Sequence, residues 1–389
     1  MRFLHTSDWH LGRTIRGHSR IDESARALDD VVRIARDEGV DAVLIAGDNF
    51  DAFGPPTDAQ KLLFETLSRF VSEGRKVVMI AGNHDSAPRM DAFARILEFT
   101  GVHCIGSPIR DDSYAPVTIT SRSGEAASIV AVPWINERFV LDYEKIAGSA
   151  QEVHEQYAQR MEAAVRYYAS RFDAKAIRVF MGHMFVHNAK PGGGERQLQM
   201  GDLFAVLGQS LPATAQYVAL GHVHRDQEVP GSPVAGASFY SGSLLQLDFG
   251  EAEQKKYVRI VDIAGPDVPA DVKRVEVSGG VTLRDIHTNL DDLRSWEGKH
   301  PHDYLRVFVE VSGPAPSLQQ QVRDALPNAV DVITVRTNQP DAQSDAPHRG
   351  LEPHELLTRY YSETHNAEIP KELLNLFVRM HEEALHATA

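Results

Sequence analysis

Five short apolar stretches of this sequence end in polar side chains, and this recurrence limits the fold more than any other feature. The stretch VVMIAGNHD, residues 77–85, carries Asn83, His84 and Asp85 directly after a strand-like apolar run. Four similar stretches are RFLHTSDWH with Asp8 and His10, AVLIAGDNFD with Asp48 and Asp51, IRVFMGH with His183, and YVALGHVH with His222 and His224. Such runs are typical of strands buried in a parallel sheet, and ligands bind beyond the carboxyl ends of those strands. We therefore predict one polar site built from five strand ends.

The order of apolar patterns predicts an α/β protein with two sheets. Helical patterns at 23–37, 57–71 and 87–99 separate the first strands, which indicates βαβ organisation. The second half is expected to hold strands near 114–120 and 127–132, a helix at about 151–172, the two histidine-bearing strands, and short strands from about 226 to 277. We predict a two-sheet α/β sandwich over residues 1–277.

Three further segments are expected after the sandwich. Residues 278–337 predict a small α+β capping domain in which a helix precedes the strand YLRVFVEVSG, followed by a helix at about 316–326 and the strand AVDVITVRT. The polar stretch 338–350 contains two prolines and is typical of a linker. Residues 351–389 predict a helical segment with an apolar stripe that includes Leu373, Leu374, Phe377 and Met380. This stripe either packs against its own chain or binds a partner protein in helix-pair fashion.

Composition restricts the class of protein and its partners. The formal net charge of −14 argues against a protein that coats nucleic acid by bulk electrostatics, so any DNA contact must be local. A single cysteine, Cys104, excludes an intramolecular disulfide and is expected to be a buried apolar residue. No apolar run has the length of a membrane helix, so we expect no membrane association and a cytoplasmic location.

The donor set at the strand ends predicts two divalent metal ions. Asp8 and His10 are two residues apart, as are His222 and His224, so each pair can point to one side of a sheet. Oxygen and imidazole donors without thiolate suit Mn²⁺, Fe²⁺ or Zn²⁺ better than Mg²⁺. Seven side chains exceed what one octahedral ion needs but divide well between two: Asp8, His10, Asp48, Asn83, His183, His222 and His224. Asp48 is the best candidate to bridge them.

Two divalent ions held by few carboxylates leave positive charge at the site, which attracts phosphate. The neutral amide of Asn83 binds metal without cancelling that charge. Paired ions of this kind activate water for in-line attack at phosphorus. His84, beside the metal site, is the expected catalytic histidine that protonates the leaving oxygen or stabilises developing charge. Asp85 is expected either to orient His84 in catalysis or to cap the next helix.

Two loops lie close to these candidates. LGRTIRGHSR, residues 11–20, contains Arg13, Arg16 and Arg20 without an acid, and we expect these arginines to contact the DNA backbone rather than form only a solvated turn. The glycine-rich stretch NAKPGGGERQLQMGD follows His183 and is expected to border the site. It lacks the lysine pattern of a nucleotide-binding loop, so ATP dependence must come from a partner.

The motifs SDWH, GDNFD, GNHD, GH and GHVH resemble those of the calcineurin-like metallophosphoesterases. The opening MRFLHTSDWHLG, the phrase GDNFDAFGPP, the cap and the helical tail are similar to the SbcD nuclease family and its eukaryotic and archaeal relatives. The resemblance implies one metal at Asp8, His10, Asp48 and His224, and a second at Asp48, Asn83, His183 and His222, with His84 catalytic. Archaeal relatives carry a second functional histidine where Asp51 stands, so Asp51 is expected to support the ligands from behind.

The resemblance also implies partners and an activity. It implies a homodimer through the helices at 57–71 and 87–99 and an SbcC-type ATPase bound by the C-terminal helices. The leading hypothesis is a Mn²⁺-dependent DNA nuclease, a 3′–5′ double-strand exonuclease and single-strand or hairpin endonuclease. It would serve an ATP-dependent complex for DNA-end processing in recombination and double-strand break repair.

Two other hypotheses remain open. One is a phosphodiesterase or phosphomonoesterase acting on small substrates, including cyclic nucleotides. A protein phosphatase is disfavoured because Ala52 and Phe53 follow GDNFD, where an arginine would hold a phosphomonoester. The other is an adaptor for an ATPase with a vestigial metal site. The complete set of ligands argues against it.

Overall fold

A computed structural model describes residues 1–109, 113–136, 150–195, 205–313, 315 and 317–336, with a few positions between 357 and 377. The chain divides into two compact units, Met1–Val335 and Arg336–Ala389. In the part of the chain that is described, no helix is long and apolar enough to cross a membrane. The following paragraphs concern the first unit.

The first sheet has six strands in the order β14-β13-β1-β4-β5-β6. Its parallel strands are β1 (Arg2–Thr6), β4 (Ala42–Ile45), β5 (Lys76–Ile80) and β6 (Val102–Ile105), and antiparallel β13 (Lys256–Asp262) and β14 (Asp271–Val277) complete one edge. The crossover helices are α1 (Ile21–Asp37), α2 (Thr57–Ser72) and α3 (Ala87–Leu97), close to the predicted ranges. Their apolar positions recur at helical spacing, as in Ala27, Val31 and Ala35, and pack onto the sheet.

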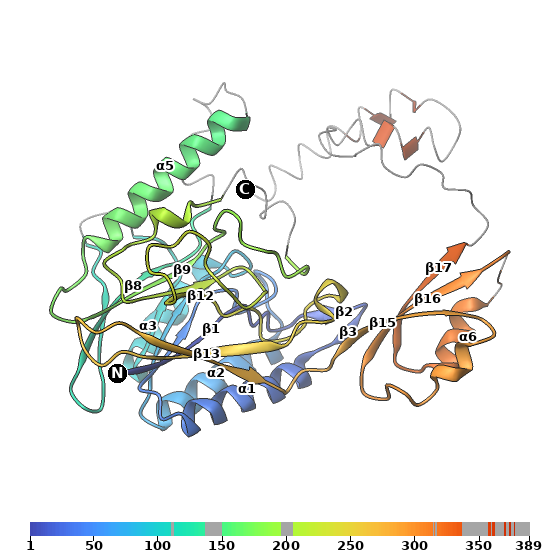
Figure 1. The fold of residues 1–389 in the computed structure, drawn as a ribbon, viewed down its shortest axis with the longest axis horizontal. Coiled ribbons are helices and arrows are strands. Elements are labelled where there is room, and N and C mark those ends of the chain that lie inside the picture. The colour runs from blue at the N-terminus through green and yellow to red at the C-terminus, as the bar shows by residue number, and fades with distance from the viewer. Residues whose placement is uncertain are drawn as a thin grey trace. The chain divides into compact units, whose positions relative to one another are not determined.

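The second sheet has the order β11-β12-β10-β9-β8-β7. Its strands are β7 (Val117–Thr120), β8 (Ala126–Val132), β9 (Ile177–His183), β10 (Tyr217–Gly221), β11 (Gln227–Glu228) and β12 (Ser238–Tyr240). Phe3 and Leu44 of the first sheet and Met181 of the second belong to one buried cluster between the sheets. Helix α5 (Ala150–Ala169) covers the outer face, where its Met161 and Val165 pack with Phe180 (Figure 1). The predicted two-sheet α/β sandwich is confirmed.

The cap contains a third sheet with the order β15-β16-β17. Its elements are β15 (Leu283–Asn289), η7 (Leu293–Trp296), β16 (Tyr304–Val311), α6 (Leu318–Ala325) and β17 (Ala329–Arg336). The helix predicted before YLRVFVEVSG was wrong, because residues 283–289 form a strand parallel to β16. Leu283 and Ile286 are three residues apart, which imitates a helical period. Pairing of Ile286 with Val307 instead buries Ile286 and Thr288 on alternate positions.

The predicted domain boundaries keep the status of predictions. The first sheet ends at Val277 and the cap sheet begins at Leu283, but both lie inside one compact unit. In the second unit, Leu373, Leu374 and Phe377 are helical positions, and Leu373 is 41% exposed. Met380 and the predicted linker 338–350 lie outside the described residues.

Candidate metal centre

The seven predicted ligands meet where the two sheets present the carboxyl ends of β1, β4, β5, β9 and β10. All seven side chains are buried. The local geometry differs from the predicted strand alternation, because β1 ends at Thr6 and both Asp8 and His10 have positive φ angles of 52° and 45°. Hydrogen bonds from Asp8 N to Gly47 O (3.0 Å) and from His10 N to Asp48 O (3.0 Å) hold this turn. The packed loops therefore sustain a backbone conformation that non-glycine residues rarely adopt.

The donor atoms divide into two groups around Asp48. Its Oδ2 lies 3.5 Å from His10 Nε2 and 3.5 Å from His183 Nε2. On one side, His10 Nε2 is 3.2 Å from His224 Nε2. On the other, Asn83 Oδ1 is 2.9 Å from both His183 Nε2 and His222 Nδ1. Asp48 thus lies between the two groups of donors.

The hydrogen-bond partners of the histidines indicate which ring nitrogens are available to bind cations. His10 Nδ1 faces Asp51 Oδ1 at 3.2 Å, His224 Nδ1 faces Glu251 Oε1 at 3.0 Å, and His183 Nδ1 faces Ala46 O at 2.8 Å. An oxygen acceptor selects Nδ1 as the protonated nitrogen, so Nε2 of each neutral ring carries a lone pair. Lone pairs then converge on the centre, together with carboxylate and amide oxygens. This arrangement of donors repels itself unless protons or metal ions lie between them, so the residues fit divalent metal ions.

The pKa shifts of Asp48 and His183 also indicate that this cluster binds positive charge. Burial would raise the pKa of Asp48, but the charge and hydrogen bond of His183, with the charges of His84 and His10, hold it well below its usual range. Burial would lower the pKa of His183, but Asp48 outweighs it and raises that pKa to about 9. Asp8 has a raised pKa because of burial. The cluster therefore attracts positive charge, either protons or metal ions.

Acidic and histidine side chains cluster in three overlapping sets within the described residues. The sets are Asp8, His10 and His224; Asp8, Asp48 and His183; and His10, Asp48 and His84. His84 belongs to the third set through its ring, and its backbone N also donates to Asp48 Oδ1 at 2.8 Å. Its Nδ1 lies 2.8 Å from Asp51 O, and its ring meets the His10 ring at a centroid distance of 4.7 Å. The main chain of Asp51 therefore orients His84 beside the predicted ligands.

Asp85 has a different environment from either role expected for it. Its carboxylate accepts hydrogen bonds from Gly82 N (2.9 Å), Asn49 N (3.1 Å), Asn49 Nδ2 (2.8 Å) and Phe50 N (3.0 Å). The N-cap residue of α3 is Ser86. Asp85 therefore ties the loop after β4 to the loop after β5, and we correct its expected catalytic role to a structural one.

The three arginines expected to contact DNA have protein partners. Arg13 Nη1 lies 3.2 Å from Asp51 Oδ1, with a quarter of its side chain exposed. Arg16 Nε donates to Asp331 Oδ2 of the cap at 2.7 Å. Arg20 is only 1% exposed and pairs with Glu23 at 2.6 Å, so it is not accessible to DNA. The expectation for Arg20 was wrong, because its guanidinium lies inside the fold.

Several residues near the ligands carried no sequence signal. Glu251, on η6 (Phe249–Glu251), contacts His224, and Glu195 Oε1 accepts from His224 N at 2.9 Å. Trp134 stacks on His222 with ring centroids 5.2 Å apart and planes 27° apart. These residues lie in loops without recurring motifs, and only Glu195 belongs to a stretch that the sequence singled out, GGGE.

The carboxylate of Asp51 faces Nδ1 of His10, and its role as a supporting group stays a prediction. Burial would raise its pKa, but the hydrogen bond from His10 and the charges of His10 and Arg13 lower it to about 2. A charged Asp51 therefore lies behind His10, while its carbonyl holds His84.

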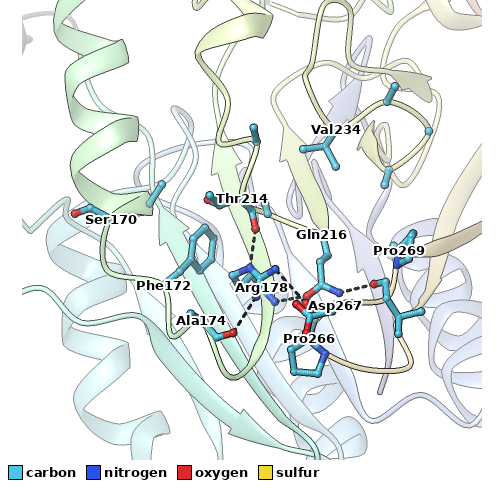
Figure 2. A pocket seen from close by; sticks show the side chains of 18 residues that line it. Ser170, Phe172, Ala174, Arg178, Thr214, Gln216, Val234, Pro266, Asp267 and Pro269 are labelled. Carbon is cyan, nitrogen blue, oxygen red and sulfur yellow. Dashed lines mark hydrogen bonds between the residues drawn. The ribbon is translucent and has the colours of Figure 1, made fainter.

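A cavity of about 1000 Å³ lies at the amino ends of β9 and β10, whereas the predicted ligands follow the carboxyl ends of these strands (Figure 2). Its lining includes Arg178 at the start of β9 and Gln216 just before β10. Arg178 donates to the carbonyl oxygens of Thr214 (2.7 Å), Ala174 (3.2 Å) and Pro266 (3.0 Å). Among the described residues that line this cavity, Asp267 is the one acidic side chain and none is a histidine.

Comparison with known proteins assigns the fold and its site to a family. Residues 1–226 match the family described as Calcineurin-like phosphoesterase, and residues 268–365 match the Type 5 capsule protein repressor C-terminal domain. A protein of Bacillus subtilis (strain 168) named as the SbcD component of the nuclease SbcCD is 31% identical over 390 residues, covering 98% of this chain and 97% of the relative. Proteins of the same name from Rhodobacter capsulatus (31% identical, 75% of this chain, 76% of the relative) and Escherichia coli K12 (28%, 86% and 85%) also match. The chain is therefore a metal-dependent hydrolase of phosphoester bonds and belongs to the SbcD nuclease family of the calcineurin-like phosphoesterases.

Proposed function

We propose that this chain is a Mn²⁺-dependent DNA nuclease and the nuclease subunit of a complex that processes DNA ends in recombination and double-strand break repair. The observation that carries this proposal is the division of the seven donors around Asp48, whose Oδ2 lies 3.5 Å from histidines of both groups. We assign Asp8, His10, Asp48 and His224 to one ion, and Asp48, Asn83, His183 and His222 to the other. Oxygen and imidazole donors in these sets suit Mn²⁺ as they do Fe²⁺ or Zn²⁺, and of these ions we propose Mn²⁺.

Each residue has a separate part in this proposal. When bound, two divalent ions acidify water and stabilise the charge that develops at phosphorus. The neutral amide of Asn83 keeps the site positive for a phosphodiester. His84, held through Nδ1 by Asp51 O, presents its other ring nitrogen to protonate the leaving oxygen. Arg13 and Arg16, whose side chains are 26% and 43% exposed, are the remaining candidates to contact the DNA phosphates.

DNA is proposed as the substrate because the similar proteins are named as nucleases. We propose 3′–5′ exonuclease activity on duplex ends and endonuclease activity on single strands and hairpins. The net charge of −14 requires the DNA contact to be local and strengthened by partners. The similar proteins are named as one component of SbcCD, which supports an SbcC-type ATPase as the partner. We propose that Leu373, Leu374, Phe377 and Met380 bind it, and that the protein acts in the cytoplasm at the nucleoid.

A second copy of the chain is the other proposed partner. Ile96 of α3 is 72% exposed, and Phe99 of η1 (Glu98–Thr100) is 90% exposed. Phe64 of α2 packs edge-on against Phe93 of α3 at a ring-centroid distance of 5.0 Å, which places both helices beside this apolar surface. Two such exposed side chains close together are typical of an interface. We propose that α2 and α3 form the homodimer contact.

The test is Mn²⁺-dependent cleavage of linear duplex, hairpin and single-stranded DNA, beside a bis-aryl phosphodiester and an aryl phosphomonoester. Wild type should cleave the DNA and the diester, and His84→Ser should lose about 10² to 10⁴-fold in kcat while it retains metal. His302→Ser is the matched control, because His302 is exposed in the cap. If the protein hydrolyses only the monoester, it is a phosphatase and not a nuclease. Absence of any turnover with metal bound would favour the adaptor.

A further inference from the structure

The histidines at the two proposed metal positions have different partners on their far side. His10 and His224, assigned to the first ion, each face a carboxylate through Nδ1: Asp51 at 3.2 Å and Glu251 at 3.0 Å. His183, assigned to the second ion, faces the neutral carbonyl of Ala46 at 2.8 Å. The second position also contains the neutral amide of Asn83. His10 and His224 are therefore supported by negative charge, whereas His183 is supported by a neutral group.

Glu251 is the most firmly held of these supporting groups. Its side chain is fully buried, and its Oε2 lies 2.5 Å from Lys256 Nζ and accepts from Leu247 N at 3.2 Å. Lys256 Nζ also donates to His224 O at 3.1 Å and to Ser243 Oγ at 2.8 Å. The ion pair compensates the burial of the carboxylate and fixes Oε2, which directs Oε1 to the imidazole of His224.

A carboxylate behind a histidine does two things that a carbonyl does less well. It fixes the ring orientation and the tautomer, and its negative charge makes the metal-binding nitrogen more basic. Two such pairs act on the first ion, whereas His183 at the second position is backed by a neutral carbonyl. We propose that Glu251, supported by Lys256, is a positioning residue for His224, and that the ion at Asp8, His10 and His224 binds more tightly than the ion at Asn83, His183 and His222. This inference rests on the two-metal site of the proposed function.

The test is a Mn²⁺ titration of the full-length metal-free protein without DNA, followed by electron paramagnetic resonance of free Mn²⁺ and by calorimetry. Wild type should bind two ions in two resolved steps. Glu251→Gln keeps an oxygen acceptor for His224 Nδ1 but removes the negative charge. His224 is then backed by a neutral oxygen, as His183 is. The tighter step should weaken by about 10 to 100-fold, and the weaker step should stay unchanged. Glu251→Asp, which restores the charge, should recover part of the loss.

The matched control is Glu23→Gln. Glu23 is also a buried carboxylate, but it pairs with Arg20 instead of a ligand histidine, so both binding steps should match wild type. If Glu251→Gln does not fold, as judged by thermal unfolding without metal, Asp51→Asn decides the question. Asp51 is less buried and supports His10 at the same ion, so this variant should weaken the same step.

Three results would overturn the inference: a wild-type isotherm with two equal sites, an unchanged tighter step in Glu251→Gln, or equal weakening of both steps. The titration contains no DNA, so it is independent of the nuclease assay. A protein that binds two Mn²⁺ ions unequally but cleaves no DNA would refute the proposed function and leave this inference standing.

Discussion

A substitution of Arg20 can distinguish a structural role of this arginine from a DNA-binding role. Its Nε and Nη2 donate to the two carboxylate oxygens of Glu23 at 3.1 and 2.6 Å, and its Nη1 donates to the carbonyl of Gln246. Arg20 is 1% and Glu23 is 3% exposed. Val281 N also donates to Glu23 Oε2 at 3.0 Å, so this ion pair joins the start of α1 to the connection between β14 and β15.

Replacement of Arg20 by alanine should therefore destabilise the protein. The variant leaves the carboxylate of Glu23 buried without its cation, and removal of one partner from a buried ion pair costs about 3–5 kcal/mol. Arg33→Ala is the control, because Arg33 is 56% exposed in its pair with Asp30, and such surface pairs contribute roughly 0–1 kcal/mol. The double variant Arg20→Met with Glu23→Leu should recover most of the loss, because neither buried charge remains.

The assay is urea unfolding of the metal-free protein, followed by circular dichroism, beside DNA binding by fluorescence anisotropy at fixed salt. We expect a lower unfolding midpoint for Arg20→Ala and little change for Arg33→Ala. The reasoning would be refuted if Arg20→Ala unfolds within about 1 kcal/mol of wild type while its affinity for DNA falls several-fold. That result would return Arg20 to the DNA-binding surface that the sequence predicts.

Three further predictions concern the metal centre, the dimer and the partner. Gly82→Ala would place a Cβ 2.1 Å from Asp48 Oδ1 and 2.3 Å from Asp48 N, so we expect roughly 1–3 kcal/mol of destabilisation and weaker Mn²⁺ binding in calorimetry. Gly54→Ala, which meets no atom within 4 Å, is the control and should behave as wild type. Phe99→Asp should give monomers in sedimentation velocity because it puts a charge into the proposed α2–α3 interface; an unchanged dimer would exclude that interface. Leu374→Glu with Phe377→Glu should abolish binding of an SbcC-type ATPase in a pull-down yet leave Mn²⁺-dependent cleavage intact, and unchanged partner binding would disprove docking through the tail.

The pattern of polar residues at strand ends predicts the position of the candidate ligands because it depends on strand pairing and on little else of the tertiary structure. Parallel strands that begin at one edge of a sheet end together at the other, so Asp8, Asp48 and Asn83 must come close once β1, β4 and β5 pair. Helices α1 to α3 follow from apolar periodicity for the same local reason. The cap strand β15 shows the limit of such patterns, because a spacing of three between Leu283 and Ile286 suits a helix, and only pairing with β16 makes it a strand.

The sequence by itself determined the two-sheet α/β fold and the set of seven candidate ligands, since both depend on short patterns repeated along the chain. The tertiary structure decided which group supports which ligand: Glu251 lies behind His224, and Asp51, expected from the sequence to support the ligands, lies behind His10. Glu251 is 27 residues from His224, and Asp51 is 41 residues from His10, so each contact depends on how separate loops pack. The same is true of Arg20. A local count of charges places Arg20 on the surface, but the packing of α1 against the connection to the cap buries it. Long-range contacts of single side chains carry no periodic signal, and for that reason only the folded chain reveals them.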